Sequence, residues 1–174
     1  MYSTKYIKPN STSEALEAIK SMGEGKFLAG GMTLIPTLKQ RLASPDGLVD
    51  ISECDLDSIS DEGDAIKIGA MTKHASVAES GLVNKAIPAL AKLADGIGDR
   101  QVRNRGTLGG SVANNDPSAC YPSAVLAVKA IVHTNTSSIE ADEFFTGMFE
   151  TALEENEIIE AISCLLYTSD AADE

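Results

Sequence analysis

The chain has 174 residues, of which 43% are hydrophobic and 23% charged, and its formal net charge is −12. This length accommodates one domain or two small lobes with a hydrophobic core. The negative charge argues against nucleic acid and anionic membrane surfaces as partners. The chain has neither an apolar run of the roughly 18 residues that a membrane span requires nor an N-terminal secretory signal. We therefore expect a cytoplasmic protein without a membrane span.

The first fifty residues predict the order β-α-β-α-β. Strands are expected at residues 6–7, 26–29 and 48–51. Between the first two, Ser11 and Glu14 have the spacing of a capping box, and an apolar helical face follows them. A second helix is expected after Thr33, whose hydroxyl is suited to the N-cap position.

The rest of the chain mixes hairpins with helices. Residues 58–60 and 65–70 flank a turn of the hairpin type. Further elements are expected as follows: helices after Thr72, at 87–94 and from Pro122; strands at 131–132, 138–139 and 157–159; and a helical turn at 142–145. Hairpins combined with strand–helix alternation favour an α+β fold.

Two segments place a glycine pair between small and hydroxyl residues, each after a predicted strand. They are Ala29-Gly30-Gly31-Met32-Thr33 and Thr107-Leu108-Gly109-Gly110-Ser111. Glycines let a ligand approach the backbone amides, and such amides bind phosphate oxygens. Two loops of this kind could hold the two phosphates of a dinucleotide from opposite sides, although each alone is also compatible with a plain turn.

The usual dinucleotide and nucleotide motifs are absent from the sequence. Gly96-Ile97-Gly98 lacks the third glycine of a Rossmann fingerprint, and there is no Gly-Lys-Ser/Thr phosphate loop. Cys54, Cys120 and Cys164 are too few and too scattered for a disulfide framework or a metal cluster. A dinucleotide would have to be held by another fold, and no metal site is expected.

Three stretches in order along the chain resemble one known family. They are FLAGGMTLIPTLKQRLASPDGLVDI, IGAMTKHASVAES and GDRQVRNRGTLGGSVANNDPSACYPSAVLAV. Together they resemble the FAD-binding, or medium, subunit of molybdenum hydroxylases, a family that includes aerobic carbon-monoxide dehydrogenases and xanthine dehydrogenases. The resemblance covers residues 1–163. It implies a two-lobed α+β FAD-binding fold of the vanillyl-alcohol oxidase / p-cresol methylhydroxylase type, without the family's C-terminal lobe.

The resemblance also implies where the cofactor FAD is bound. The family's pyrophosphate loop falls on Ala29, Gly30, Gly31, Met32 and Thr33, and its second flavin loop on Thr107, Leu108, Gly109, Gly110 and Ser111. Relatives place Ile68-Gly69-Ala70 beside the flavin. Some relatives have an aspartate where this chain has Cys120, so we expect the nearby Asp116 to take part instead. Many relatives have asparagine at the position of Ser111, so that side-chain contact is expected to be weaker here.

Other candidate side chains have simpler interpretations. Arg103 and Arg105 are expected to tie the loop to neighbouring carboxylates rather than to contact phosphate. His74 and His133 are expected to be surface or core residues rather than bases, and Cys120 to be a buried, inert thiol. No side chain is expected to act as a catalytic acid, base or nucleophile, because a flavin would perform the redox chemistry.

By resemblance, a large subunit with a molybdenum–pterin centre oxidises the substrate. Electrons pass through 2Fe–2S clusters of a small subunit to FAD on this chain, and then to an acceptor such as NAD, a quinone or oxygen. Two alternatives stay open: a self-contained flavin oxidoreductase of the same fold, and a fragment that folds without binding FAD.

The sequence predicts three segments: a β-α-β FAD-binding lobe at 1–55, a second α+β lobe at 56–163, and a terminal segment at 164–174. The last, CLLYTSDAADE, resembles the translation of a transposase sequencing adaptor. We expect it to be an artefact rather than native sequence, and the natural protein to continue past residue 163.

Overall fold

A computed structural model describes residues 2–166 of the chain. The strands are β1 (Lys5–Ile7), β2 (Gly25–Leu28), β3 (Gly47–Asp50), β4 (Ile59–Asp61), β5 (Ala65–Gly69), β6 (Ile131–Thr134), β7 (Ser138–Glu140), β8 (Phe145–Gly147), β9 (Glu150–Thr151) and β10 (Ile159–Leu165). The helices are α1 (Thr12–Lys20), α2 (Leu34–Lys39), α3 (His74–Glu79), α4 (Gly81–Ala86), α5 (Pro88–Asp95), α6 (Arg100–Arg103), α7 (Leu108–Asn114), α8 (Cys120–Ala127) and α9 (Ala141–Phe144). The structure thus confirms the prediction that the chain combines α-helices and β-strands.

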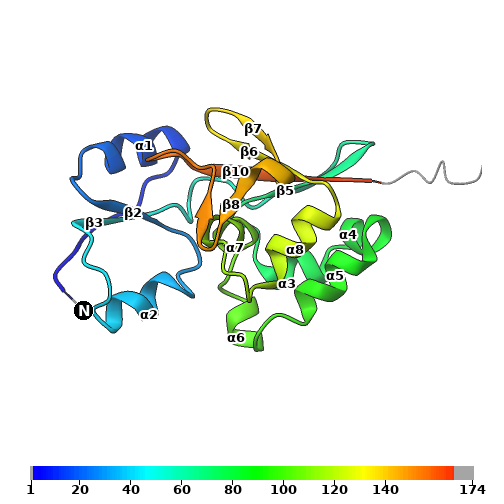
Figure 1. Cartoon of the computed structure of the whole chain (residues 1–174), viewed down its shortest axis with the longest axis horizontal. Coiled ribbons are helices and arrows are strands. Elements are labelled where there is room, and N and C mark those ends of the chain that lie inside the picture. Colours follow the sequence, from blue (N-terminus) through cyan, green and yellow to red (C-terminus); the bar gives the residue numbers. More distant parts are fainter. Residues whose placement is uncertain (1, 167–174) are drawn as a thin grey trace, which may run out of the picture.

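The N-terminal part is a parallel three-stranded sheet in the order β1-β3-β2. Helices α1 and α2 lie on opposite sides of this sheet (Figure 1). Ala15 and Ile19 of α1 are buried in one cluster with Val49 and Ile51. The predicted β-α-β-α-β order is confirmed, and this cluster is its hydrophobic core.

The start of α1 follows from its capping residues. The Ser11 side chain accepts a hydrogen bond from the Glu14 amide at 3.2 Å, and the Glu14 carboxylate accepts one from the Asn10 amide at 2.9 Å. The pair therefore satisfies two amides at the helix start, as the capping-box spacing predicts. The carboxylate reaches one residue further back than in the standard form of that motif.

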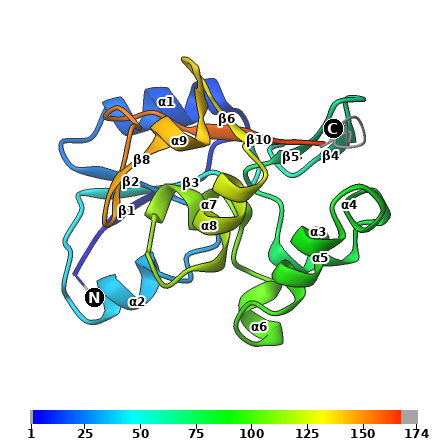
Figure 2. The ribbon, with the colours of Figure 1, turned by 45° about the vertical axis from the view of Figure 1, so that its right-hand side comes forward.

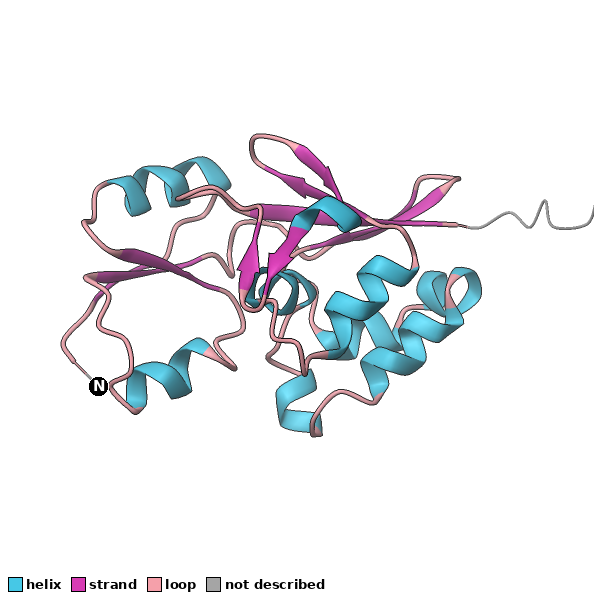
Figure 3. Ribbon diagram, in the orientation of Figure 1, coloured by secondary structure: helices cyan, strands magenta, loops and turns pink. Residues whose placement is uncertain are grey.

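The larger sheet has five strands in the order β4-β5-β10-β6-β7, and all of its pairings are antiparallel. β10 is its central strand, where Ile162 lies opposite Ile68 on one side and Val132 on the other. Helices α3 to α8 lie on one side of this sheet (Figure 3). α7 lies between the two sheets (Figures 1 and 2). Its Leu108 and Val112 are fully buried in the larger hydrophobic cluster, which also contains Ile68, Val132 and Ile162 and is called the main core below.

Several helix starts differ from the sequence-based expectation. Lys73, not Thr72, is the N-cap of α3, because the Thr72 carbonyl accepts a hydrogen bond from Leu108 in a neighbouring segment. α8 begins at Cys120, two residues before Pro122, and Thr33 precedes α2 without a side-chain capping bond. The start of α3 thus depends on a contact with a distant segment, which a local capping pattern does not contain.

The predicted segment boundaries stay predictions, although the structure bears on one of them. β10 continues through Cys164 and Leu165, and Cys164 is buried in the main core. The first two residues of the predicted adaptor segment are therefore part of the central strand of the larger sheet. Residues 167–174 of the predicted adaptor segment lie outside the described residues. Within residues 2–166, no helix is long and apolar enough to cross a membrane, and no cluster of metal-binding side chains is present.

Candidate functional site

A cavity of about 630 Å³ lies between the two sheets. Both glycine-pair segments line it, one from the end of β2 and one from the start of α7. Its size is within the range typical of small-molecule sites. Apolar side chains form much of the remaining wall: Phe27, Ile51, Met71, Leu153, Ile158 and Ile159.

The first loop, residues 29–33, offers free hydrogen-bond donors to the cavity. Gly31 has a φ of +74°, a conformation that L side chains rarely adopt. Within residues 2–166, five consecutive backbone N–H groups donate no hydrogen bond to a protein atom, those of Gly30, Gly31, Met32, Thr33 and Leu34. Unpaired amides at a cavity wall require water or a ligand as acceptor. An anionic group is the acceptor that such a run of donors suits best.

The second loop uses its backbone amides within the protein. Leu108 donates to the Thr72 carbonyl at 3.0 Å, Gly109 to the Ala70 carbonyl at 2.8 Å, and Gly110 to the Thr107 hydroxyl at 3.2 Å. The expectation that both loops present free amides is therefore wrong for these three residues. The expected strand before this loop is only a single β-bridge between Lys73 and Thr107. The second loop can still contribute side chains and a closely packed surface.

The two loops approach each other so closely that side chains would not fit between them. A Cβ atom on Gly30 would lie 2.1 Å from the carbonyl oxygen of Arg105. A Cβ atom on Gly110 would lie 2.8 Å from the Thr107 hydroxyl and 3.4 Å from the Ala29 Cβ. The glycines therefore allow one continuous wall made from segments about 80 residues apart in the sequence.

The structure separates the predicted site residues into two groups. Those that line the cavity are Ala29, Gly30, Gly31, Met32, Thr33, Thr107, Gly109, Gly110, Ser111 and Asp116. The Leu108 side chain instead points into the core and is fully buried. Of the segment 68–70, only Ala70 lines the cavity.

Cys120 is exposed, so the expectation of a buried thiol is wrong. It is the first residue of α8, whose buried residues are Tyr121, Pro122 and Val125. Cys120 does not line the cavity, although its neighbour Ala119 does.

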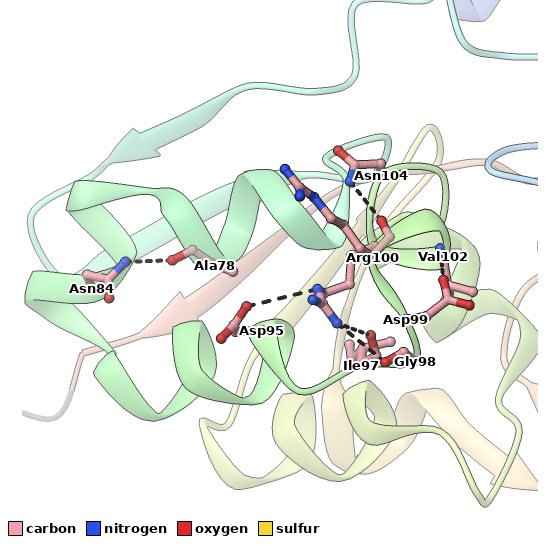
Figure 4. A network of polar contacts seen from close by, with 10 residues as sticks. Ala78, Asn84, Asp95, Ile97, Gly98, Asp99, Arg100, Val102 and Asn104 are labelled. Atoms are coloured by element: carbon pink, nitrogen blue, oxygen red, sulfur yellow. Dashed lines mark hydrogen bonds and ion pairs between the residues drawn. The ribbon is translucent and has the colours of Figure 1, made fainter.

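Arg103 has the structural role that we expected for it. Its guanidinium donates to the carbonyls of Ile97 at 3.1 Å and Gly98 at 3.4 Å, and lies 3.9 Å from the Asp95 carboxylate (Figure 4). These contacts hold the turn before α6. The carboxylate contact expected for Arg105 is not found within residues 2–166: its side chain is exposed, and its backbone carbonyl contributes to the contact with Gly30.

His74 is a core residue rather than a surface one, within the expectation for it, and it also lines the cavity, which sequence reasoning did not predict. Its side chain is 5% exposed, its Nδ1 atom is buried without a hydrogen-bond partner, and its ring lies 5.2 Å from that of Tyr121. Burial lowers the pKa of His74 to about 4. The imidazole is therefore neutral at physiological pH.

Replacing His74 with glutamine is expected to flatten the pH dependence of stability between pH 6.5 and 4. In that window the unfolded chain takes up a proton at His74 and the folded chain does not, so acidification favours unfolding. The wild type should lose up to about 1.4 kcal/mol per pH unit relative to the variant. Urea titrations at several pH values measure this difference. The same change at half-buried His133 should flatten the profile less, and identical slopes for His74→Gln and the wild type would contradict the assignment.

Glu157 is a second lining residue that sequence reasoning missed. It is 8% exposed, and its carboxylate accepts hydrogen bonds from the Thr134 and Thr136 hydroxyls and from the Glu154 amide at 2.8 Å. The other charged residues of the wall are Lys26 and Asp116, both more exposed. No sequence pattern signals Glu157, because two of its donors lie more than 20 residues away.

Comparison with known proteins identifies the relatives of this chain. Residues 2–164 match the family model described as the FAD binding domain in molybdopterin dehydrogenase. The carbon monoxide dehydrogenase medium chain of Hydrogenophaga pseudoflava is 39% identical over 161 residues, which are 89% of this chain and 56% of that protein. The nicotine 6-hydroxylase medium subunit of Paenarthrobacter nicotinovorans is 34% identical over 160 residues, with coverages of 89% and 56%. The chain thus spans about half the length of these curated relatives.

Solved structures agree in fold. A carbon monoxide dehydrogenase from Hydrogenophaga pseudoflava superposes with a TM-score of 0.93 at 37% identity, covering 97% of this chain and 61% of that one. Quinoline 2-oxidoreductase from Pseudomonas putida 86 superposes with a TM-score of 0.92 at 30% identity, covering 96% and 60%.

Proposed function

Because the chain belongs to the family of FAD-binding domains in molybdopterin dehydrogenases, we propose that it binds FAD in the cavity between its two sheets as part of a molybdenum hydroxylase. FAD is the cofactor of this family. The observation that carries the proposal is the run of five unpaired amides from Gly30 to Leu34, in a cavity that also has an apolar wall. A diphosphate and a planar aromatic ring match these two parts of the cavity.

The residues present fit this cofactor. The amides of the first loop would bind the diphosphate, and the hydroxyls of Thr33 and Ser111 would add donors at the same wall. Asp116 lines the cavity as well, and its carboxylate is suited to accept hydrogen bonds from the hydroxyl groups of the sugar chain. Gly109, Gly110 and the buried Leu108 would act by packing rather than by amide donation.

When bound, FAD supplies the electron-transfer chemistry that side chains lack. The protein's own contribution is to bind and orient the cofactor and to exclude water from the apolar wall. His74 stays neutral beside that wall, so it adds no positive charge at physiological pH.

We further propose the position of this chain in a larger complex. A 2Fe–2S small subunit would deliver electrons that a molybdopterin large subunit takes from substrate, and an acceptor such as NAD, a quinone or oxygen would receive them. The names of the relatives, which are medium chains or subunits, support this division of labour. The vanillyl-alcohol oxidase type of fold, the missing C-terminal lobe and a cytoplasmic location remain part of the proposal.

Two alternatives make different predictions. A self-contained flavin oxidoreductase would bind FAD but would not co-purify with an iron–sulfur subunit when the two are expressed together. A chain that folds without FAD would give a native circular dichroism spectrum and no flavin binding.

Affinity is expected to follow the order FAD, then FMN, then riboflavin, because the first loop binds phosphate and riboflavin has none. FAD should bind at least tenfold more tightly than riboflavin, a difference of about 1.4 kcal/mol or more. Competition titrations that follow flavin fluorescence measure this order. Equal affinity for the three flavins would show that the amides of the first loop do not bind the diphosphate.

A further inference from the structure

Glu157 stands out among the acidic residues of the chain. It immediately precedes Ile158 and Ile159, and all three line the cavity. Within residues 2–166 it is the one carboxylate that is buried. A buried charge acts over longer distances than an exposed one, because water does not screen it.

Neutral donors surround this carboxylate. The hydroxyls of Thr134 and Thr136 donate to Oε1, the Ser137 hydroxyl lies 3.4 Å from Oε1, and the Glu154 amide donates to Oε2 at 2.8 Å. Burial by itself raises the pKa of Glu157, but these hydrogen bonds outweigh it and the pKa lies below its ordinary value. The group is therefore a carboxylate at neutral pH.

No cation neutralises this charge in the described part of the chain. The ion pairs within residues 2–166 are Lys8–Glu53, Lys67–Glu62 and Arg103–Asp95, and none involves Glu157. Lys26 lines the same cavity but is exposed. The wall next to Ile158 and Ile159 therefore carries the negative charge of Glu157 without an ion-paired cation.

We infer that Glu157 lowers the reduction potential of the bound flavin through this fixed negative charge in the cavity wall. The inference rests on the proposed function, since it requires FAD in the cavity. The apolar surface that suits the flavin ring includes Leu153, Ile158 and Ile159, which flank Glu157 in the sequence. Two-electron reduction with uptake of one proton would leave the ring with a net negative charge, and a nearby carboxylate would disfavour that reduced state. Glu157 is thus a tuning residue rather than a catalytic one.

The test is the reduction potential of FAD bound to the chain, with wild type and Glu157→Gln compared at pH 7. Dithionite supplies the two electrons and is oxidised to sulfite, while a reference dye in the same solution reports the potential by its colour. When the same fraction of the dye is reduced in both samples, the ratio of reduced to oxidised flavin should be at least threefold higher in Glu157→Gln than in the wild type. An unchanged ratio would overturn the inference, because a purely structural role would alter affinity or stability but not the potential.

Two further variants keep this test decisive. Glu155→Gln removes an exposed carboxylate two residues away, outside the cavity wall, and should leave the ratio unchanged. Thr136→Lys places an ammonium group beside the Glu157 carboxylate from an exposed position, so it should raise the ratio as Glu157→Gln does. The fold should tolerate Glu157→Gln, because Asn135 and Ile158 join the same segments through bonds of 2.8 and 3.1 Å.

The outcomes separate the inference from the proposed function. Absence of FAD binding by the folded wild type would reject the proposed function. If the wild type and the variants all bind FAD and the bound flavin has the same reduction potential in each, only the role of Glu157 is rejected. If Glu157→Gln binds no FAD, an unchanged potential in Thr136→Lys rejects the role of Glu157.

Discussion

Replacing Gly30 with alanine is expected to weaken FAD binding at least tenfold and to lower the free energy of unfolding by about 1–3 kcal/mol. The new Cβ would lie 2.1 Å from the carbonyl oxygen of Arg105 and 2.8 Å from the Gly106 Cα. Both are backbone atoms that cannot rotate away, so the two loops must separate. That separation moves the unpaired amides of the first loop away from the opposite wall of the cavity. Fluorescence titration with FAD and urea unfolding measure the two effects.

Gly81 provides the matched control for this substitution. A Cβ atom there meets nothing within 4 Å, and the residue, the first of α4, does not line the cavity. Gly81→Ala should therefore leave FAD affinity unchanged and stability equal or slightly higher, since alanine favours helix more than glycine does. If Gly30→Ala behaved like Gly81→Ala, the close contact between the loops would not matter for the site.

The neighbouring glycines of the second loop are expected to respond differently to the same substitution. At Gly109 a Cβ would lie 2.5 Å from the Ala70 Cβ and 2.8 Å from its carbonyl oxygen, which accepts the Gly109 hydrogen bond. Gly109→Ala must push α7 away from the end of β5. We expect a loss of about 3 kcal/mol in the free energy of unfolding, from overpacking together with a weakened hydrogen bond.

Gly110→Ala is expected to spare the fold and impair the site. Its Cβ would press on the Thr107 hydroxyl at 2.8 Å, which weakens a helix cap by about 1 kcal/mol. Alanine has a higher helix propensity than glycine, and this gain in the free energy of unfolding offsets the loss at the cap. The methyl group would stand 3.4 Å from the Ala29 Cβ, in the space between the loops, so FAD affinity should fall several-fold. Equal stability losses at both positions, measured by urea unfolding, would contradict this division of roles.

The sequence was sufficient to predict features that depend on local patterns. The capping residues of α1, the hairpin of β4 and β5, and both glycine pairs were all visible in short windows. The glycines marked places where the backbone is closely approached, because no other residue allows such contact. Of the residues predicted in the two glycine loops and at Asp116, all but Leu108 line a single cavity.

The sequence could not predict which partner each backbone group finds. Gly109 and Gly110 looked like amides free to bind a ligand. In the structure the Gly109 amide donates to the carbonyl of residue 70 and the Gly110 amide to the Thr107 hydroxyl. Glu157 gave no signal, because two of its donors, Thr134 and Thr136, come from the end of β6 and the turn after it. The exposure of Cys120 likewise follows from the face that α8 turns to the core. Each of these depends on contacts between distant segments, which periodicity and spacing do not contain.

Calorimetric titration of the wild-type chain with FAD tests the proposed cofactor site most directly. We expect saturable binding of one FAD per chain, together with a melting temperature that rises with FAD concentration, because ligand binding stabilises the folded state. A chain with a native circular dichroism spectrum, no binding heat and an unchanged melting temperature at high FAD concentration would contradict the proposal that this cavity binds FAD.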